Sequence, residues 1–306
     1  MSIMVKSGIK ESDLLKGILN TISDGVTVID TDQKKAQALL NKTLLESSEE
    51  LDRLNNELSD AAGYVKSVLP QPITAGSIHA DWRFIPCSNL GGDSFGYHWV
   101  DEDHFAVYLI DVSGHGWGAA LFSVSIVNAI RSQSLPETDF RDPGKVLESL
   151  NHAFPSERHN DMFFTIWYGV YQLSSGILTY SSGGHPPGLL IAKTTDGASE
   201  HVKLRTPGII IGGRPKAVFE NKSHQVISGS RLLLFSDGVY ELKQSDDTVW
   251  GLNNFISFVK ETRMSGNSYL EGIINRAKTL MRGNAFDDDV TILEIIFNNA
   301  NGWDAA

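Results

Sequence analysis

The sequence predicts an α+β fold in which strands and helices alternate beyond residue 72, and three observations support this prediction. Segments rich in β-branched and aromatic residues alternate with segments of helical periodicity. One very short link connects the predicted strands that end near residue 171 and begin near residue 177, and a second short link spans residues 183–187. Because links of this length are expected to join antiparallel neighbours, the sequence argues against a doubly wound parallel sheet and for mixed α+β layers.

The first 36 residues form the first predicted segment. Residues 12–33 indicate a short helix, a turn at Asp24 and Gly25, and a strand at residues 26–29. A helix that leads into a G-(I/V)-x-V-x-D strand resembles the opening of a PAS sensor domain. Because this stretch is too short to fold alone, we expect residues 1–36 to be a PAS-like fragment or an N-terminal extension.

A leucine-rich helix is predicted for residues 37–69. Counting by sevens gives two apolar columns, with Ser47 off the pattern: Leu44, Leu51, Leu58 and Val65, and three residues later Leu40, Ser47, Leu54, Ala61 and Val68. This pattern favours a parallel coiled coil and therefore a homodimer. The alternative is a single helix that packs its apolar stripe on the main domain. Pro70 and Pro72 end the helix, so we expect a domain boundary there.

Residues 70–299 form the predicted main domain, followed by a tail at residues 300–306. Strands are predicted at residues 78–85, 104–110, 163–171, 177–181, 188–192, 231–235 and 290–297. Helices are predicted at residues 118–132, 143–153, 252–262 and 268–281. A chain of 306 residues can hold one such body and an appendage.

Charge and composition exclude several classes of protein. The 37 acidic and 26 basic residues give a formal charge of −11, which disfavours nucleic acid and anionic membranes as partners. The single Cys87 excludes an intrachain disulfide and a cysteine-rich zinc site, which indicates a reducing compartment. The first residues lack the apolar core of a signal peptide, and no apolar run is long enough to span a bilayer. We therefore expect a cytoplasmic protein.

Acidic residues stand at the ends of three predicted strands. Asp111 and Asp237 each follow a strand, whereas Asp288 precedes the last one. All three reach the same edge if the last strand runs antiparallel to the others. A fourth candidate, Asp93, follows two glycines that allow the backbone to approach an ion closely. Taken one at a time, each motif also fits an ordinary turn or a strand cap.

Carboxylates gathered at one edge require positive charge between them, since two unit charges 4 Å apart repel by about 4 kcal/mol at an effective dielectric constant of 20. Ligands that are all oxygen favour Mg²⁺ or Mn²⁺ over zinc. Two such ions can share a water, lower its pKa and place it for in-line attack on phosphorus. This chemistry is hydrolysis without a covalent enzyme intermediate.

Five motifs occur in an order that matches a known family. They are Gly91-Gly92-Asp93, Asp111-Val-Ser-Gly-His-Gly116 with Ala119-Ala-Leu121, Ser182-Gly-Gly-His-Pro-Pro187, Phe235-Ser-Asp-Gly-Val239 with Glu241, and Asp287-Asp-Asp-Val-Thr291. Together they resemble the SpoIIE/RsbU branch of the PPM (protein phosphatase type 2C-like) phosphatases. The resemblance covers residues 76–298 and implies a four-layer αββα sandwich of two antiparallel sheets flanked by helices.

The resemblance also implies a site that holds two Mn²⁺ or Mg²⁺ ions. Its carboxylate ligands would be Asp93, Asp111, Asp237 and Asp288, joined by the backbone carbonyl of Val112, whereas Asp289 would lie outside the ligand set. The family often has an acid where this chain has Gly96, which puts a third metal position in doubt. No arginine can be assigned to hold a substrate phosphate. For His115 and His185 a structural role is favoured over a catalytic one.

The implied activity is that of a metal-dependent protein serine/threonine phosphatase. The implied substrate is a phosphorylated protein, with a STAS-domain anti-sigma-factor antagonist as the family's example, and an upstream sensor or regulator is expected. Two alternatives stay open at this point. One is a catalytically silent PPM-fold signalling scaffold. The other is a metal-dependent phosphohydrolase that acts on nucleotides, against which the negative charge and the absence of phosphate-loop motifs argue.

Overall fold

The computed structural model describes residues 11–87, 90–193, 199–244, 247–262, 268–281, 283 and 285–298. The chain divides into two compact units between Asp60 and Ala61. The predicted tail at residues 300–306 lies outside the described residues.

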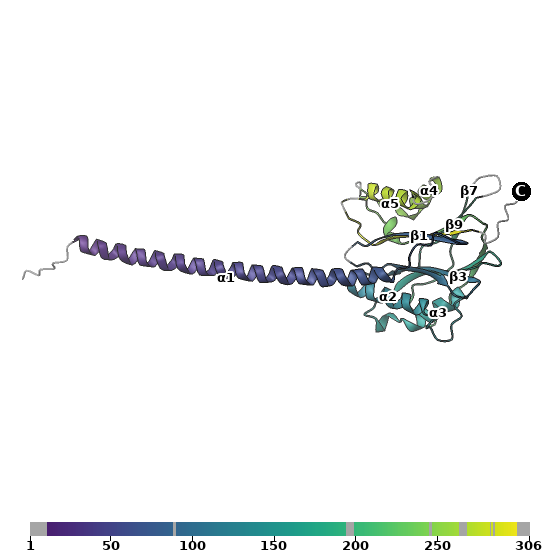
Figure 1. Cartoon of the computed structure of the whole chain (residues 1–306), viewed down its shortest axis with the longest axis horizontal. Helices are drawn as coiled ribbons and strands as arrows, with labels where there is room; N and C mark the ends of the chain where they lie inside the picture. The colour runs from purple at the N-terminus through teal and green to yellow at the C-terminus, as the bar shows by residue number, and fades with distance from the viewer. Residues whose placement is uncertain are drawn as a thin grey trace, which may run out of the picture. The chain divides into compact units, whose positions relative to one another are not determined.

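The first described element is α1 (Glu11–Val68), a helix of 58 residues that is drawn in purple in Figure 1. The predicted turn at Asp24 and Gly25 and the predicted strand at residues 26–29 are wrong, because these residues are helical. Intrinsic preferences of β-branched residues against a helix are small, below about 1 kcal/mol each. The favourable free energy of extending a helix that has already nucleated outweighs these small preferences. None of the helices that the structure describes has the length and apolar character needed to cross a bilayer.

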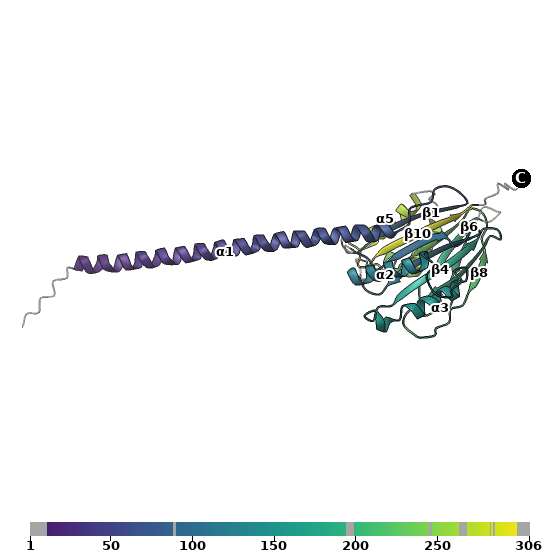
Figure 2. The same cartoon turned by 60° about the horizontal axis from the view of Figure 1, so that its bottom comes forward.

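Two five-stranded sheets form the centre of the second unit. Sheet A has the order β1-β10-β9-β6-β7, with bounds Ile78–Ile85, Val290–Phe297, Ser230–Phe235, Gly188–Lys193 and Ser199–Leu204. Sheet B has the order β2-β3-β4-β5-β8, with bounds Ser94–Trp99, His104–Val112, Phe164–Gln172, Ile177–Gly183 and Lys222–Gln225. Each neighbouring pair in these orders is antiparallel. Figure 2 shows strands of both sheets, such as β10 and β4, running in similar directions.

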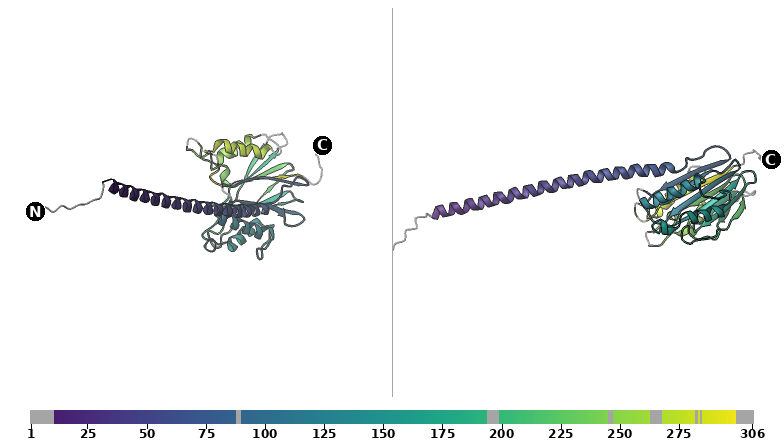
Figure 3. Two further views of the ribbon diagram at one scale, coloured as in Figure 1. Left: turned by 60° about the vertical axis from the view of Figure 1, so that its left-hand side comes forward. Right: turned by 90° about the horizontal axis from the view of Figure 1, so that it is seen from below.

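Helices cover the two outer faces of this pair of sheets. In Figure 1, α4 (Gly251–Glu261) and α5 (Ser268–Leu280) lie on one side, and α2 (Trp117–Arg131) and α3 (Pro143–Ala153) lie on the other. The views in Figure 3 show the same layers. One apolar cluster fills the space between the sheets, a second joins α2 and α3 to sheet B, and a third joins α4 and α5 to sheet A. The predicted αββα architecture is confirmed.

Large side chains hold the two sheets together. Trp167 of β4 is fully buried, and its indole Nε1 donates a hydrogen bond of 3.0 Å to the Leu204 carbonyl of β7, in the other sheet. Phe95 and Leu293 are fully buried in the same inter-sheet cluster. Full burial of one such side chain contributes about 1.5–3 kcal/mol, so this layer fixes the spacing of the sheet edges that carry the acidic residues.

One of the two short links joins strands of the same sheet, and the other joins strands of different sheets. The link after Gln172 joins β4 to β5 as antiparallel neighbours, as predicted. The prediction for residues 183–187 is wrong, because β5 belongs to sheet B and β6 to sheet A. Gly184 adopts a φ of 74°, which allows the chain to turn sharply from one sheet to the other. The same link therefore positions groups from both sheets at one end of the sandwich.

Candidate metal centre

The four predicted aspartates come from both sheets. Asp93 precedes β2, and Asp111 lies near the end of β3 in sheet B. Asp237 follows β9 and begins a short 3₁₀ turn (Asp237–Val239), and Asp288 precedes β10. The predicted antiparallel pairing of β10 with β9 is confirmed, with Ile292 opposite Phe235. This register brings Asp237 and Asp288 to the same end of sheet A.

The charges of several of these carboxylates raise one another's pKa values. Burial, followed by the charges of Asp237, Asp288, Asp289 and Glu241, raises the pKa of Asp111 to about 8. The pKa of Asp237 rises to about 6 through burial and then through the charges of Asp288 and Glu241. Burial and the charges of Asp111 and Asp289 raise the pKa of Asp93 as well. The sequence-predicted residues therefore share one electrostatic environment.

Asp288 and Asp289 are neighbours with different surroundings. Asp289 is buried, and its carboxylate accepts hydrogen bonds from the backbone amides of Cys87 at 2.9 Å and of Asp93 at 3.3 Å. Asp288 is exposed, and its Oδ1 accepts from the Asp289 amide at 2.8 Å. Asp289 thus fixes the loop that carries Asp93, whereas one oxygen of Asp288 has no bond to an amide in the described residues.

Hydrogen bonds also fix the orientation of Asp93. The hydroxyl of Thr291, on β10 in sheet A, donates to its Oδ2 at 2.6 Å. Because Asp93 leads into β2 of sheet B, this bond joins the two sheets at the acidic edge. A charge-assisted hydrogen bond of this kind also favours the ionised carboxylate, which opposes the effect of burial.

Gly92 allows the loop to approach the end of β3. A Cβ atom at this position would lie 2.8 Å from the Val112 carbonyl oxygen and 3.0 Å from that of Gly114. Both distances are shorter than ordinary contacts. The absence of a side chain at Gly92 therefore keeps the predicted backbone ligand of Val112 beside the loop that carries Asp93.

Gly96 stands where the family often has a second acid. A Cβ atom there would overlap the ring and hydroxyl of Tyr108, which is 1% exposed. Any larger side chain would require this buried tyrosine to move. The departure at Gly96 therefore has a packing reason in β2 and β3.

The chemistry of this cluster fits hard divalent cations. Its side-chain donors are carboxylate oxygens, and all four carboxyl groups have pKa values raised by burial and by neighbouring negative charge. A divalent cation between them would remove this repulsion and favour the ionised forms. Oxygen donors of this type are those that Mg²⁺ and Mn²⁺ prefer.

Comparison with known proteins decides the family. The family model described as Stage II sporulation protein E (SpoIIE) matches residues 101–298. This chain belongs to the SpoIIE family. The predicted SpoIIE/RsbU branch of the PPM phosphatases, which are generally metal-dependent, is thereby confirmed.

Two curated relatives come from Bacillus subtilis (strain 168). The SpoIIE-family chain is 29% identical over 189 residues to phosphoserine phosphatase RsbP, covering 60% of this chain and 45% of RsbP. It is 31% identical over 160 residues to phosphoserine phosphatase RsbU, covering 52% of this chain and 45% of RsbU. The match spans less than half of the length of either relative.

Solved structures share the fold of this SpoIIE-family chain. The SiaA-PP2C domain of Pseudomonas aeruginosa has a TM-score of 0.68 and 19% identity, and the match covers 81% of this chain and 97% of that one. The PP2C phosphatase domain with a regulatory fragment of SpoIIE from Bacillus subtilis has a TM-score of 0.61 and 14% identity, with 73% and 64% covered. At these identities the likeness shows the fold.

Sequence reasoning missed three contributors to the site. Glu241 contributes to the raised pKa values of Asp111 and Asp237, although the sequence analysis gave it no role beyond accompanying the Phe235–Val239 motif. Thr291 binds Asp93 across 198 residues of sequence. The Cys87 thiol lies with Asp288 and Asp289 in a group whose ligand atoms are within 4.8 Å of one another. Burial, followed by the charge of Asp289, raises the pKa of this thiol to about 12, so it is protonated at neutral pH.

The two histidines in the motifs have different surroundings. His115 is exposed, and it lies near Asp288, whose pKa burial raises. His185 is 3% exposed, and its Nδ1 lies 2.8 Å from the Thr165 hydroxyl oxygen. Burial lowers the pKa of His185 to about 3, so the ring is neutral. Thr165 lies opposite Asp111 in the β3–β4 ladder, so His185 contacts the strand neighbour of a predicted ligand.

Proposed function

We propose that this chain is a metal-dependent protein phosphatase that hydrolyses phosphoserine or phosphothreonine in a signalling partner. The observation that supports the proposal is that burial, with the charges of Asp237 and Asp288 at the end of the other sheet, raises the pKa of Asp111 to about 8. Membership of the SpoIIE family and likeness to two proteins named phosphoserine phosphatases support the same reaction.

The proposed ligands of two Mn²⁺ or Mg²⁺ ions are the carboxylates of Asp93, Asp111, Asp237 and Asp288 and the carbonyl of Val112. Bound there, the ions would supply Lewis acidity and an activated water for in-line attack on phosphorus. Thr291 would hold the Asp93 carboxylate in the ligand orientation, and Asp289 would hold the backbone amide of Asp93. Because the pKa of Asp111 is raised, ion binding near neutral pH would release its proton.

Release of phosphate from a phosphoserine protein in the presence of Mn²⁺ tests this function. We expect Asp111→Asn and Asp237→Asn each to lose most of the activity, because an amide cannot replace a charged ligand. Asp161→Asn is the matched control, since Asp161 is exposed and asparagine tolerates its φ of 58°. Full activity in both site variants would refute the ligand assignment.

The proposed substrate is a phosphorylated STAS-domain anti-sigma-factor antagonist in the cytoplasm. Dephosphorylation would let the antagonist capture its kinase and free a transcription factor. The support is the resemblance to the SpoIIE/RsbU branch. Comparing phosphate release from such an antagonist with release from an unrelated phosphoserine protein tests the assignment, and equal rates would contradict it.

We also propose that residues 37–69 form a coiled-coil homodimer next to a phosphatase domain of residues 70–299. In the single chain the seam leucines Leu40, Leu44, Leu51 and Leu54 are 53%, 59%, 58% and 43% exposed, so a second copy would bury them. At the end of α1, Ala62 and Val65 belong to one apolar cluster with Ala120 and Val124 of α2. Because α2 follows the Asp111 loop, ordering of the coiled coil by an upstream regulator would change the population of the metal-loaded state.

A further inference from the structure

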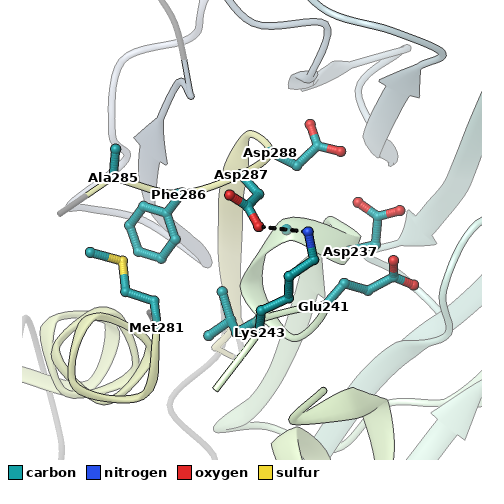
Figure 4. A pocket seen from close by; sticks show the side chains of 10 residues that line it. Asp237, Glu241, Lys243, Met281, Ala285, Phe286, Asp287 and Asp288 are labelled. Atoms are coloured by element: carbon teal, nitrogen blue, oxygen red, sulfur yellow. Dashed lines mark ion pairs between the residues drawn. The ribbon is translucent and has the colours of Figure 1, made fainter. Parts of the chain in front are cut away.

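A cavity of about 210 Å³ lies directly beside the acidic cluster. Figure 4 shows its two halves: Asp237, Glu241 and Asp288 lie to one side, and Phe286 and Met281 lie to the other. Phe286 is 8% exposed and forms part of the apolar cluster under sheet A, so this wall is fixed by packing. One half of the cavity therefore suits a metal-bound anion, and the other suits an apolar group.

Lys243 lies between the two halves. Its Nζ is 3.4 Å from Asp287 Oδ2, and both side chains are 69% exposed. An exposed pair of this length contributes little to stability, from about 0 to 1 kcal/mol. The backbone of Lys243 is nevertheless held, because it forms an isolated bridge with Val249. The ammonium group can therefore change partner while its attachment point stays in place.

Positive charge in addition to the ions would favour a phosphoryl group at the metal site. Such a group would approach Asp237, Glu241 and Asp288, which repel it wherever they are not neutralised. Among the described residues that line the cavity, Lys243 is the only basic one. It is therefore the side chain placed to hold the phosphate, the role for which the sequence offered no arginine.

A phosphate ion alone would leave the apolar half of the cavity without a complementary contact. A phosphorylated residue within a protein brings its neighbours with it, and a large apolar neighbour would reach Phe286 and Met281 when the phosphate reaches Lys243. The charge and the apolar wall thus complement two parts of one ligand.

We propose that Lys243 exchanges Asp287 for the substrate's phosphoryl group, and that Phe286 and Met281 bind a large apolar side chain next to the phosphorylated residue. The inference rests on the proposed phosphatase function and names its substrate class: phosphoserine or phosphothreonine flanked by leucine, isoleucine, methionine or phenylalanine.

Steady-state hydrolysis of two matched phosphopeptides with Mn²⁺ tests this inference. The peptides carry leucines or alanines beside the phosphoserine. We expect Lys243→Met to raise KM for both peptides about tenfold, the loss expected when a charge-assisted hydrogen bond is removed, with a smaller change in kcat. Lys243→Arg should stay near wild type. Lys203→Met, at an exposed position on β7, is the matched control and should leave KM unchanged.

The apolar wall has its own test. Met281→Ala, at a half-buried position, and Phe286→Leu should raise KM for the leucine peptide several-fold and leave the alanine peptide unchanged. Two variants are used because Phe286 also packs in the core, and a melting curve for each shows whether it folds. Equal KM values for the two peptides in wild-type protein would overturn the apolar part, and an unchanged KM in Lys243→Met would overturn the phosphate part.

A binding measurement separates this inference from the phosphatase proposal. Fluorescence anisotropy follows a labelled leucine phosphopeptide, with its unphosphorylated form for comparison, on Mn²⁺-loaded protein. If hydrolysis is absent but Lys243→Met weakens binding of the phosphopeptide alone, the phosphatase proposal fails and the binding site stands. If wild type and Lys243→Met bind both peptides equally, the inference itself is overturned.

Discussion

Asp111 is a carboxylate whose charge depends strongly on what surrounds it. Its pKa of about 8 lies above its ordinary value of 3.8, so the folded metal-free protein holds a proton that the unfolded chain releases. The resulting stabilisation is complete below the unfolded pKa and is lost as the pH rises through the folded pKa. Burial lowers the pKa of His185 and His98 from 6.5, and these groups act in the opposite sense at pH values below 6.5.

The first prediction uses the pH window around the raised pKa of Asp111. In chelator, Tm of the wild-type protein should fall by several degrees from pH 6.5 to 8.5, because Asp111 loses its proton against neighbouring charges. The Tm of Asp111→Asn should change less over this pH range. In wild-type protein, added Mn²⁺ should abolish the fall in Tm between pH 6.5 and 8.5. Melting curves follow this, and a wild-type Tm that rises over the window would contradict the electrostatic account.

The second prediction concerns Gly92. Gly92→Ala places a Cβ 2.8 Å from the Val112 carbonyl oxygen, so the loop must move away from the end of β3. We expect the affinity for Mn²⁺ to fall about 10- to 100-fold, the range for disturbed support of metal ligands. Gly63→Ala is the control, since no atom lies within 4 Å of its added Cβ. Calorimetry measures both variants, and wild-type affinity in Gly92→Ala would exclude this role.

The sequence predicted Asp111, Asp237 and Asp288 because each stands at the end of a predicted strand, and Asp93 because it follows two glycines. The hydrogen bonds that hold Asp93 and Asp289 were not predictable, since they join segments that are far apart in the sequence. Thr291 and Asp93 are 198 residues apart, and Cys87 and Asp289 are 202 apart. No local pattern marks either pair.

At the scale of elements, the link of residues 183–187 carries His185 from sheet B toward sheet A, with its ring bonded to Thr165. Since Thr165 lies opposite Asp111, this bond supports the strand that carries a proposed ligand. Thr165→Val removes the hydroxyl with little change of shape and leaves a buried ring nitrogen unpaired, which costs about 1–3 kcal/mol.

We therefore predict that Thr165→Val lowers Tm and weakens Mn²⁺ binding together. The matched control is Thr179→Val on β5, where Thr179 and Ser223 pair at 2.9 Å in an exposed position. Melting curves and calorimetry provide the two readouts. A lower Tm with unchanged Mn²⁺ affinity would show that the bond serves stability alone.

The three strands that the sequence did not predict are all edge strands. β2 and β8 are the edges of sheet B, and β7 is an edge of sheet A. Their sequences, SFGYHW, SEHVKL and KSHQ, carry polar residues that obscure strand alternation. Charged and polar residues on an edge strand discourage its pairing with another chain. The same residues interrupt the apolar pattern from which a strand is predicted. Central strands such as β10 matched their predicted bounds because burial demands continuous apolar runs.

At the scale of the whole molecule, periodicity and link lengths predicted mixed α+β layers, and the family resemblance was needed for the αββα order. The crossing from sheet B to sheet A could not be predicted, because a short link serves a hairpin and a change of sheet equally well. The apolar heptads led to a long helix, and the helix of α1 extends well beyond the predicted start at residue 37.

The coiled coil gives a prediction at the same scale. Leu44→Ala with Leu51→Ala removes two exposed seam leucines, so the molar mass in light scattering should fall toward that of one chain. Leu45→Ala, at a position 61% exposed but outside both columns, should leave the mass unchanged. A wild-type protein that is monomeric at micromolar concentration would refute the dimer.

Isothermal titration calorimetry with Mn²⁺ tests the convergence of the four aspartates most directly. The account predicts two bound ions per wild-type chain, and loss of at least one of them in each of Asp93→Asn, Asp111→Asn, Asp237→Asn and Asp288→Asn. Wild-type stoichiometry and affinity in all four variants would contradict it.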